Sequence, residues 1–218
     1  TWTQQAKLIG ATVSASTWYG YSVDIDNDTV VVGARRALVA GISAGAVYVH
    51  VRSGAAWTEQ ARLAAPVGVL NDSFGWSCAL SGDTAIVGAP QDDYASLTDA
   101  GSAYVFTRSA GVWALQGTLQ PAVPATGDFF GASVDVLGDR ALVGAQSDDT
   151  PVAVNSGAGY VFDRNAGVWS QVAHLYGATW YDLNGDQGGY AVSLSAHGAV
   201  VAAPHDQTDA GVQAGTLS

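Results

Sequence analysis

The residues best suited to metal binding lie in the stretch Asp182-Leu183-Asn184-Gly185-Asp186. Oxygen ligands at alternate loop positions suit Ca²⁺, which makes Asp182, Asn184 and Asp186 candidate ligands and Ca²⁺ the candidate cofactor. The competing reading is structural, because Asp72 and Asp128 also stand three residues before a glycine and can cap a turn there. No acidic residue follows where a calcium loop supplies its bidentate ligand. The pattern therefore favours a structural turn over a calcium site.

A second run of alternating carboxylates, Asp24-Ile25-Asp26-Asn27-Asp28, has the same two readings. Its last three residues, Asp26-Asn27-Asp28, align with Ser81-Gly82-Asp83, which reads as a plain hairpin turn. Asp and Asn favour such turns because their side chains bond the nearby backbone. The alignment predicts a turn here rather than a metal site.

Acidic and aromatic side chains also gather in loops that recur along the chain. Asp92-Asp93 and Asp148-Asp149 occupy matching positions, and the first loop of this kind has Arg35-Arg36 instead. Large aromatic rings that break the regular pattern are candidates for stacking on a ligand; they include Trp18 and Trp76. Our candidate ligand-binding residues are Tyr94, Trp180, Tyr181, Asp92, Asp93, Asp148 and Asp149. They would line a rim that holds a glycan, a protein or a cation, and the alternative is a solvated acidic rim.

No catalytic set stands out in this sequence. The four histidines are scattered, and neighbouring carboxylates in an extended chain point to opposite sides. The sequence has no H-E-x-x-H or P-loop motif, and Cys78 is its single cysteine. We expect a protein without enzymatic activity, in which Cys78 is a small core residue.

The loops that present these candidates belong to an internal repeat, and two sets of residues mark its period. Glycines open four similar phrases at steps of 55, 56 and 58 residues: Gly20, Gly75, Gly131 and Gly189. Tryptophans recur at steps of 55, 56 and 56 residues: Trp2, Trp57, Trp113 and Trp169. Repetition at such a period indicates an architecture built from one supersecondary unit.

Each unit contains four short strand-like runs. In the second unit these runs are 75–80, 84–87, 102–107 and 113–119. They are rich in β-branched and aromatic residues and are joined by hairpin-type connections. Four short strands per unit are typical of a β-propeller blade. We expect an all-β β-propeller of four blades of about 55 residues, each with four strands.

The phrases Phe74-Gly75 and Gly88-Ala89-Pro90 resemble those of FG-GAP repeat proteins, the group that includes the integrin α-subunit propeller. The resemblance covers essentially the whole chain and is strongest in the second and third units. It implies a β-propeller in an extracellular setting, secreted or at a cell surface, with adhesion as a family role. It implies no single activity, since one fold serves many functions.

Composition limits the partners. The chain has 218 residues, with Lys+Arg 8, Asp+Glu 19 and a formal net charge of −11. So few basic residues argue against nucleic acid and against anionic membrane surfaces. No apolar run approaches the roughly 20 residues that span a bilayer, so we expect no membrane insertion.

We expect one domain over residues 1–218. Its parts are a leading strand at 1–8 and blade units at about 16–63, 72–119, 128–175 and 186–218. The leading strand, Trp2 to Leu8, would be the fourth strand of a preceding blade. It could complete the last unit and close a four-bladed ring, or the chain could be an arc of a larger or multi-chain propeller. Unpaired strand edges in an arc would favour self-association.

Overall fold

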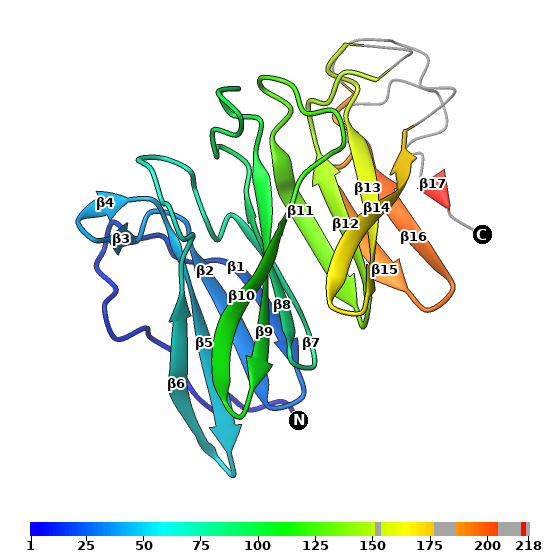
Figure 1. Ribbon diagram of the computed structural model, residues 1–218. Helices are drawn as coiled ribbons and strands as arrows, with labels where there is room; N and C mark the ends of the chain where they lie inside the picture. The colour runs from blue at the N-terminus through cyan, green and yellow to red at the C-terminus, as the bar shows by residue number, and fades with distance from the viewer. Residues whose placement is uncertain (151–153, 177–185, 205–214, 217–218) are drawn as a thin grey trace.

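The computed structural model describes residues 1–150, 154–176, 186–204 and 215–216, and no helix occurs in these ranges. The chain forms a row of antiparallel sheets in sequence order, which we call blades 1 to 4 (Figure 1). Blade 1 contains β1 (Tyr19–Asp26), β2 (Thr29–Ala34), β5 (Ala46–Ser53) and β6 (Ala56–Leu63). Blade 2 contains β7 (Ser77–Ser81), β8 (Thr84–Ala89), β9 (Ser102–Ser109) and β10 (Val112–Leu119). Blade 3 contains β11 (Phe130–Leu137), β12 (Arg140–Ala145), β13 (Ala158–Asn165) and β14 (Val168–Leu175). Blade 4 contains β15 (Ala191–Ser195), β16 (Gly198–Ala202) and β17 (Gly215–Thr216).

The predicted all-β class is confirmed, and the blades are propeller-like. The four runs predicted in the second unit coincide with β7 to β10. A small hairpin of β3 (Leu38–Val39) and β4 (Ile42–Ser43) was not predicted, because two-residue strands leave no periodic pattern. Nowhere in the described ranges is there a helix long and apolar enough to cross a bilayer.

The hydrophobic core lies between successive blades. Val31 and Val49 of blade 1 pack against Cys78 and Leu80 of blade 2, and equivalent apolar clusters fill the next two boundaries. Cys78 is 9% exposed, as expected for a small core residue. Since each boundary buries side chains from two sheets, a blade depends on its neighbours for its stability.

Polar bonds repeat across the same boundaries. The hydroxyl of Ser77 donates to the carbonyl oxygen of Gly131 in the next blade at 2.8 Å. The carboxylate of Asp24 accepts the backbone N–H of Leu80 at 2.7 Å, and Asp135 accepts that of Leu194 at 2.6 Å. These bonds hold the inner strands of adjacent blades in register.

A second repeated contact joins the outer strands. The indole of Trp113 donates to Gln60 Oε1 of the preceding blade at 2.8 Å, and Arg108 lies over the indole ring at 5.1 Å. One repeat later, Trp169 and Gln116 form the same bond at 2.8 Å. The phased tryptophans of β10 and β14 therefore pack between blades, as the repeat predicted.

The prediction of a leading strand at residues 1–8 is not confirmed. Residues 1–10 contain no strand, and Trp2 is fully exposed. No strand of the described chain pairs with this segment, and an isolated strand is not stable in water. One contact nevertheless follows the repeat, because Trp57 Nε1 donates to Gln5 Oε1 at 3.2 Å, as Trp113 does to Gln60.

The row of blades does not close into a ring among the described residues (Figure 1). At the blade 1 end, Val23 and Ile25 are 65% and 61% exposed. At the other end, Ala191 and Ala202 of blade 4 stand at the positions of Ser77 and Gly88 in blade 2. Ser77 and Gly88 both contact Gly131 of the next blade, and alanine cannot reproduce these contacts. Blade 4 thus lacks two of the groups with which the other blades hold their successor.

Candidate functional site

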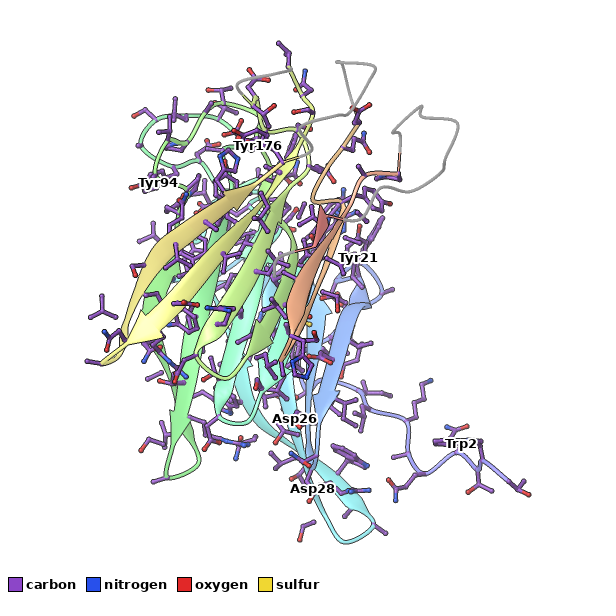
Figure 2. All side chains as sticks on the ribbon, turned by 90° about the vertical axis from the view of Figure 1, so that its right-hand side faces the viewer. Trp2, Tyr21, Asp26, Asp28, Tyr94 and Tyr176 are labelled. Atoms are coloured by element: carbon purple, nitrogen blue, oxygen red, sulfur yellow. The ribbon has the colours of Figure 1, made fainter. Side chains whose placement is uncertain are left out.

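The blades have two different ends, and the longer loops gather at one of them. Short hairpins such as 26–29 and 81–84 form the hairpin end, while the loops after β2, β8 and β12 form the loop end. Figure 2 shows Tyr94 and Tyr176 at the loop end and Asp26 and Asp28 at the hairpin end. The hairpins and the longer loops lie at opposite ends because neighbouring strands within each blade are antiparallel, so successive connections alternate between the two ends.

Two of the predicted rim carboxylates, Asp92 and Asp148, are buried rather than exposed. Asp92 is 9% exposed and accepts a hydrogen bond from the Tyr104 hydroxyl at 2.7 Å. Asp148 is 4% exposed and lies 3.0 Å from His174 Nε2. Burial, together with the bond to Asp92, raises the pKa of Tyr104. The sequence-based view of exposed acidic pairs is thus wrong for these two, which attach their loops to the sheets.

The adjacent carboxylates, Asp93 and Asp149, are exposed and shape their own loops. Asp93 accepts the backbone N–H of Asp99 at 3.0 Å, and Asp149 accepts that of Asn155 at 2.8 Å. Tyr94 is 41% exposed on a turn closed by Leu97 N–H and the Tyr94 carbonyl at 2.8 Å. Of the predicted rim residues that the structure describes, Tyr94 presents the most accessible ring.

The aspartates that precede the opening glycines are structural. Asp72 and Asp128 are each 3% exposed and accept the backbone N–H groups of Val69 and Ala125. Burial is the main cause that raises the pKa of each carboxyl to about 6. Asp186, at the same position of the fourth unit, is 1% exposed.

The predicted residues Trp180, Tyr181, Asp182 and Asn184 lie outside the described ranges. Within those ranges, no three His, Cys, Asp or Glu side chains come together in a way that could hold a metal ion. The turn reading of Asp26-Asn27-Asp28 is confirmed, because these residues close the hairpin of β1 and β2, in which Asp26 pairs with Thr29.

The most unusual arrangement at the loop end surrounds Arg35. Its guanidinium carbon lies 4.2 Å from the ring centre of Trp18, 4.5 Å from that of Tyr21 and 4.6 Å from that of Trp76. Arg35 directly follows β2, whereas the rings flank the starts of β1 and β7, the inner strands of neighbouring blades. The packing of these inner strands therefore assembles the cluster. Each ring face attracts the cation, an interaction worth roughly 0.5–2 kcal/mol.

Beside this cluster lies a polar cavity of about 250 Å³, which we call the arginine pocket. Its lining residues are Arg35, Arg36, Ser43, Asn71, Ser73 and Gln91. The lining contains two cationic side chains and no carboxylate. Burial lowers the pKa of Arg35, and the positive charge of Arg36 adds to this shift.

A larger cavity, of about 350 Å³, lies at the boundary of blades 3 and 4. Its single arginine, Arg140, is already paired with Asp163 at 2.7 Å. The remaining lining groups include Val161, Leu194 and His197. This cavity therefore offers a ligand fewer uncommitted polar groups than the arginine pocket does.

Sequence reasoning found part of this site. Trp18 and Trp76 stood out as aromatic residues outside the pattern, and Arg35-Arg36 as a departure from the acidic loops. Tyr21 was missed, although it directly follows an opening glycine, as Trp76 does. Two features of the sequence could have indicated it. Tyr21 and Trp76 each follow an opening glycine in adjacent units, and Arg35 stands where the second unit has Pro90.

Comparison with known proteins agrees with the repeat. The FG-GAP repeat model matches residues 2–50, 57–106 and 113–162, more than half of the chain. The second and third matched stretches each run from an outer strand, β6 or β10, to the third strand of the following blade, so each spans a blade boundary. The curated proteins include no match.

Among solved structures, the chain is similar to Sqt1 of Saccharomyces cerevisiae at 11% sequence identity and a TM-score of 0.49. The match covers 76% of this chain and 37% of that one, so this chain spans little more than a third of Sqt1. The family model alone establishes the repeat, and the stretches that it matches include residues that pack adjacent blades together. The chain belongs to the FG-GAP repeat family.

Proposed function

We propose that this chain is a non-enzymatic extracellular module that binds a glycan or a protein through its loop end. In this proposal its blades form an arc of a β-propeller. The setting outside the cell and the role in adhesion rest on its family, and the ligand-binding role rests on the site.

The observation that supports ligand binding most directly is the arginine pocket beside the half-exposed Trp18 and Tyr21. Trp18 is 47% exposed and Tyr21 is 40% exposed. Concave sites with a few convergent polar groups and nearby aromatic rings are the usual form of a ligand site. Rigid sheets that position variable loops suit such a role.

The absence of enzymatic activity is supported by how the acidic side chains are used. Asp72, Asp92 and Asp148 each accept or share a hydrogen bond with a protein group that holds a loop in place. A general acid or base must instead reach the substrate. These three carboxylates are committed to structure, so we assign them no catalytic role.

An array of glycans and extracellular proteins, probed with the whole chain, tests this proposal. We expect a ligand whose signal falls in Trp18→Ala or Tyr94→Ala. Val168→Ala serves as the matched control, because Val168 is 69% exposed at the hairpin end. Retained binding in both loop-end variants, or loss in the control alone, would place the ligand elsewhere and refute the proposal.

A structural role through self-association is the second candidate. The specific observation is the exposure of Val23 and Ile25, whose equivalents Cys78 and Leu80 in blade 2 are buried against blade 1. A face built like an interior boundary exposes apolar surface that another chain can cover. In this candidate the chain is a subunit of an extracellular filament or surface layer.

Calcium is a third, separable part of the proposal. Asp182, Asn184 and Asp186 would supply its oxygen ligands, and the ion would stabilise the segment that connects blades 3 and 4. The alternate spacing of these three oxygen-bearing residues in the sequence supports this assignment.

A further inference from the structure

We propose that the arginine pocket binds the acid group, a carboxylate or a sulfate, of an acidic saccharide. This inference rests on the proposed function, because it names the ligand class of the same loop end. Arg35 and Arg36 would bind the acid group, and the neutral side chains of the pocket would bind sugar hydroxyls.

The charges of the pocket call for an anion. Arg52, Arg108, Arg140 and Arg164 each form an ion pair with an aspartate, whereas Arg35 and Arg36 form none within the described chain. Arg35 Nε is buried and has no hydrogen-bond partner in these ranges. A buried cationic donor without a partner is costly. An oxyanion in the cavity, which Arg35 lines, would instead meet the terminal N–H groups of its guanidinium in short, charge-assisted bonds.

The aromatic cluster prepares Arg35 for this contact. Trp18, Tyr21 and Trp76 surround the guanidinium, and their faces hold the cation in place. A planar guanidinium that stacks on rings still presents its N–H groups along its edge, in the fork geometry that fits carboxylate and sulfate oxygens. Because the side chain is already held by the rings, little rotamer entropy is lost on binding.

The neutral lining suits a sugar rather than an acidic peptide. Ser73 donates to Gln91 Oε1 at 2.7 Å, which directs the NH₂ group of Gln91 away from that bond. Ser43 and Asn71 add a hydroxyl and an amide, groups that both donate and accept as sugar hydroxyls do. At about 250 Å³ the cavity is smaller than the roughly 300–1,000 Å³ of drug-sized sites, so it fits one acidic sugar unit.

The net charge of the chain further restricts the class of ligand that the site can bind. At a formal charge of −11, the protein as a whole repels long polyanions. A short oligosaccharide with few acid groups avoids most of this repulsion while it still meets both arginines. We therefore expect the site to prefer short acidic oligosaccharides over nucleic acid.

Titration calorimetry on the whole chain tests this inference with matched probes. The probes are an oligogalacturonate, a sulfated oligosaccharide and a neutral oligosaccharide of equal length, together with sodium sulfate and an acidic peptide. We expect binding of the uronate or the sulfated sugar, with the better of the two identifying the acid group, and at least about tenfold weaker binding of the neutral sugar.

The variant Arg36→Gln should weaken binding of the acidic sugar about tenfold or more while its Tm stays close to that of the parent protein. Arg35→Gln should do the same, but it also empties the aromatic cluster, so Arg36→Gln is the cleaner probe. Arg52→Gln is the matched control: it removes one positive charge at the hairpin end of the same blade and should leave affinity unchanged.

Three results would overturn the inference while leaving a loop-end ligand in place. They are equal binding of neutral and acidic sugars, unchanged affinity in Arg36→Gln, and binding of the acidic peptide alone. Sodium sulfate that binds as well as the oligosaccharide would show a simple anion site and refute the saccharide assignment. If neither these probes nor any array ligand bound the loop end, the proposed function would fail as well.

Discussion

Gly88 lies so close to Gly131 of the next blade that a Cβ atom on Gly88 would stand 2.0 Å from the Gly131 carbonyl oxygen. The same approach recurs at 2.2 Å between Gly33 and Gly75 and at 2.1 Å between Gly144 and Gly189. The glycine of the Phe-Gly phrase in one blade thus meets the glycine of the Gly-Ala-Pro phrase in the blade before it. The two phrases that define the repeat form a single contact across each boundary.

Replacing Gly88 by alanine should therefore disrupt the boundary of blades 2 and 3. The added methyl group meets a backbone carbonyl, which cannot rotate away, and overpacking of this kind costs about 1–3 kcal/mol. We expect a clear fall in Tm and in the free energy of unfolding measured by urea titration. Gly117→Ala is the control, since nothing lies within 4 Å of its Cβ position. Equal Tm values for the two variants would contradict this account of the repeat.

The tryptophan–glutamine bond between outer strands gives a second prediction. Gln60 Oε1 accepts from Trp113 Nε1 at 2.8 Å and from Arg108 Nη1 at 3.3 Å. Gln60→Leu leaves both donors without this acceptor, so we expect a loss of about 1–3 kcal/mol in urea unfolding. Gln5→Leu should cost much less, because its bond to Trp57 is exposed and longer, at 3.2 Å. A larger loss for Gln5→Leu would show that residues 1–10 stabilise blade 1 more than the repeat contacts do.

Much of the fold could be predicted because the repeat displays each strand several times. One blade, such as Ser77–Leu119, contains only short apolar runs, but their recurrence at steps of about 55 residues separates strands from loops. The leading strand could not be judged in this way. Trp2 and Gln5 follow the pattern of Trp57 and Gln60, yet strand formation depends on a pairing partner, which a local pattern does not reveal.

The site was harder to predict, because its groups come from different units. Asp92 and Asp148 look like solvent-exposed loop residues until Tyr104 and His174 are seen beneath them. Arg35 lies among three rings only because blades 1 and 2 bring the starts of their inner strands together. Such contacts depend on how the strands and blades pack in space, and the spacing of the repeat along the sequence does not reveal them.

The buried carboxyl of Asp72 makes stability depend on pH. Its pKa is raised to about 6, mainly by burial, against an ordinary value of 3.8. The folded protein therefore binds more protons than the unfolded chain between about pH 4 and pH 6, and this contribution to stability is lost as pH rises through 6. We expect Asp72→Asn to raise Tm relative to the parent protein more at pH 7 than at pH 4.5. The same gain at both pH values would show that ionisation of Asp72 costs the folded protein nothing.

The exposed apolar face of blade 1 gives a prediction about self-association. Ile25 is 61% exposed, whereas its equivalents Leu80 and Val136 are 6% and 4% exposed in the boundaries of the following blades. An interior-type surface left open favours association between chains. We expect light scattering to give a mass above the 22.2 kDa of one chain, rising with protein concentration.

Ile25→Lys should return that species to the monomer mass, because a charge on this face would be buried without a partner in the contact. Val112→Lys is the control: Val112 is 69% exposed on an outer strand, and its replacement should leave the mass unchanged. Repeating the measurement with EDTA tests calcium, since loss of the assembly on chelation would make Asp182, Asn184 and Asp186 the leading ligands. A 22.2 kDa monomer at all concentrations, unaffected by chelation, would eliminate both assembly and calcium dependence and leave loop-end ligand binding as the function to pursue.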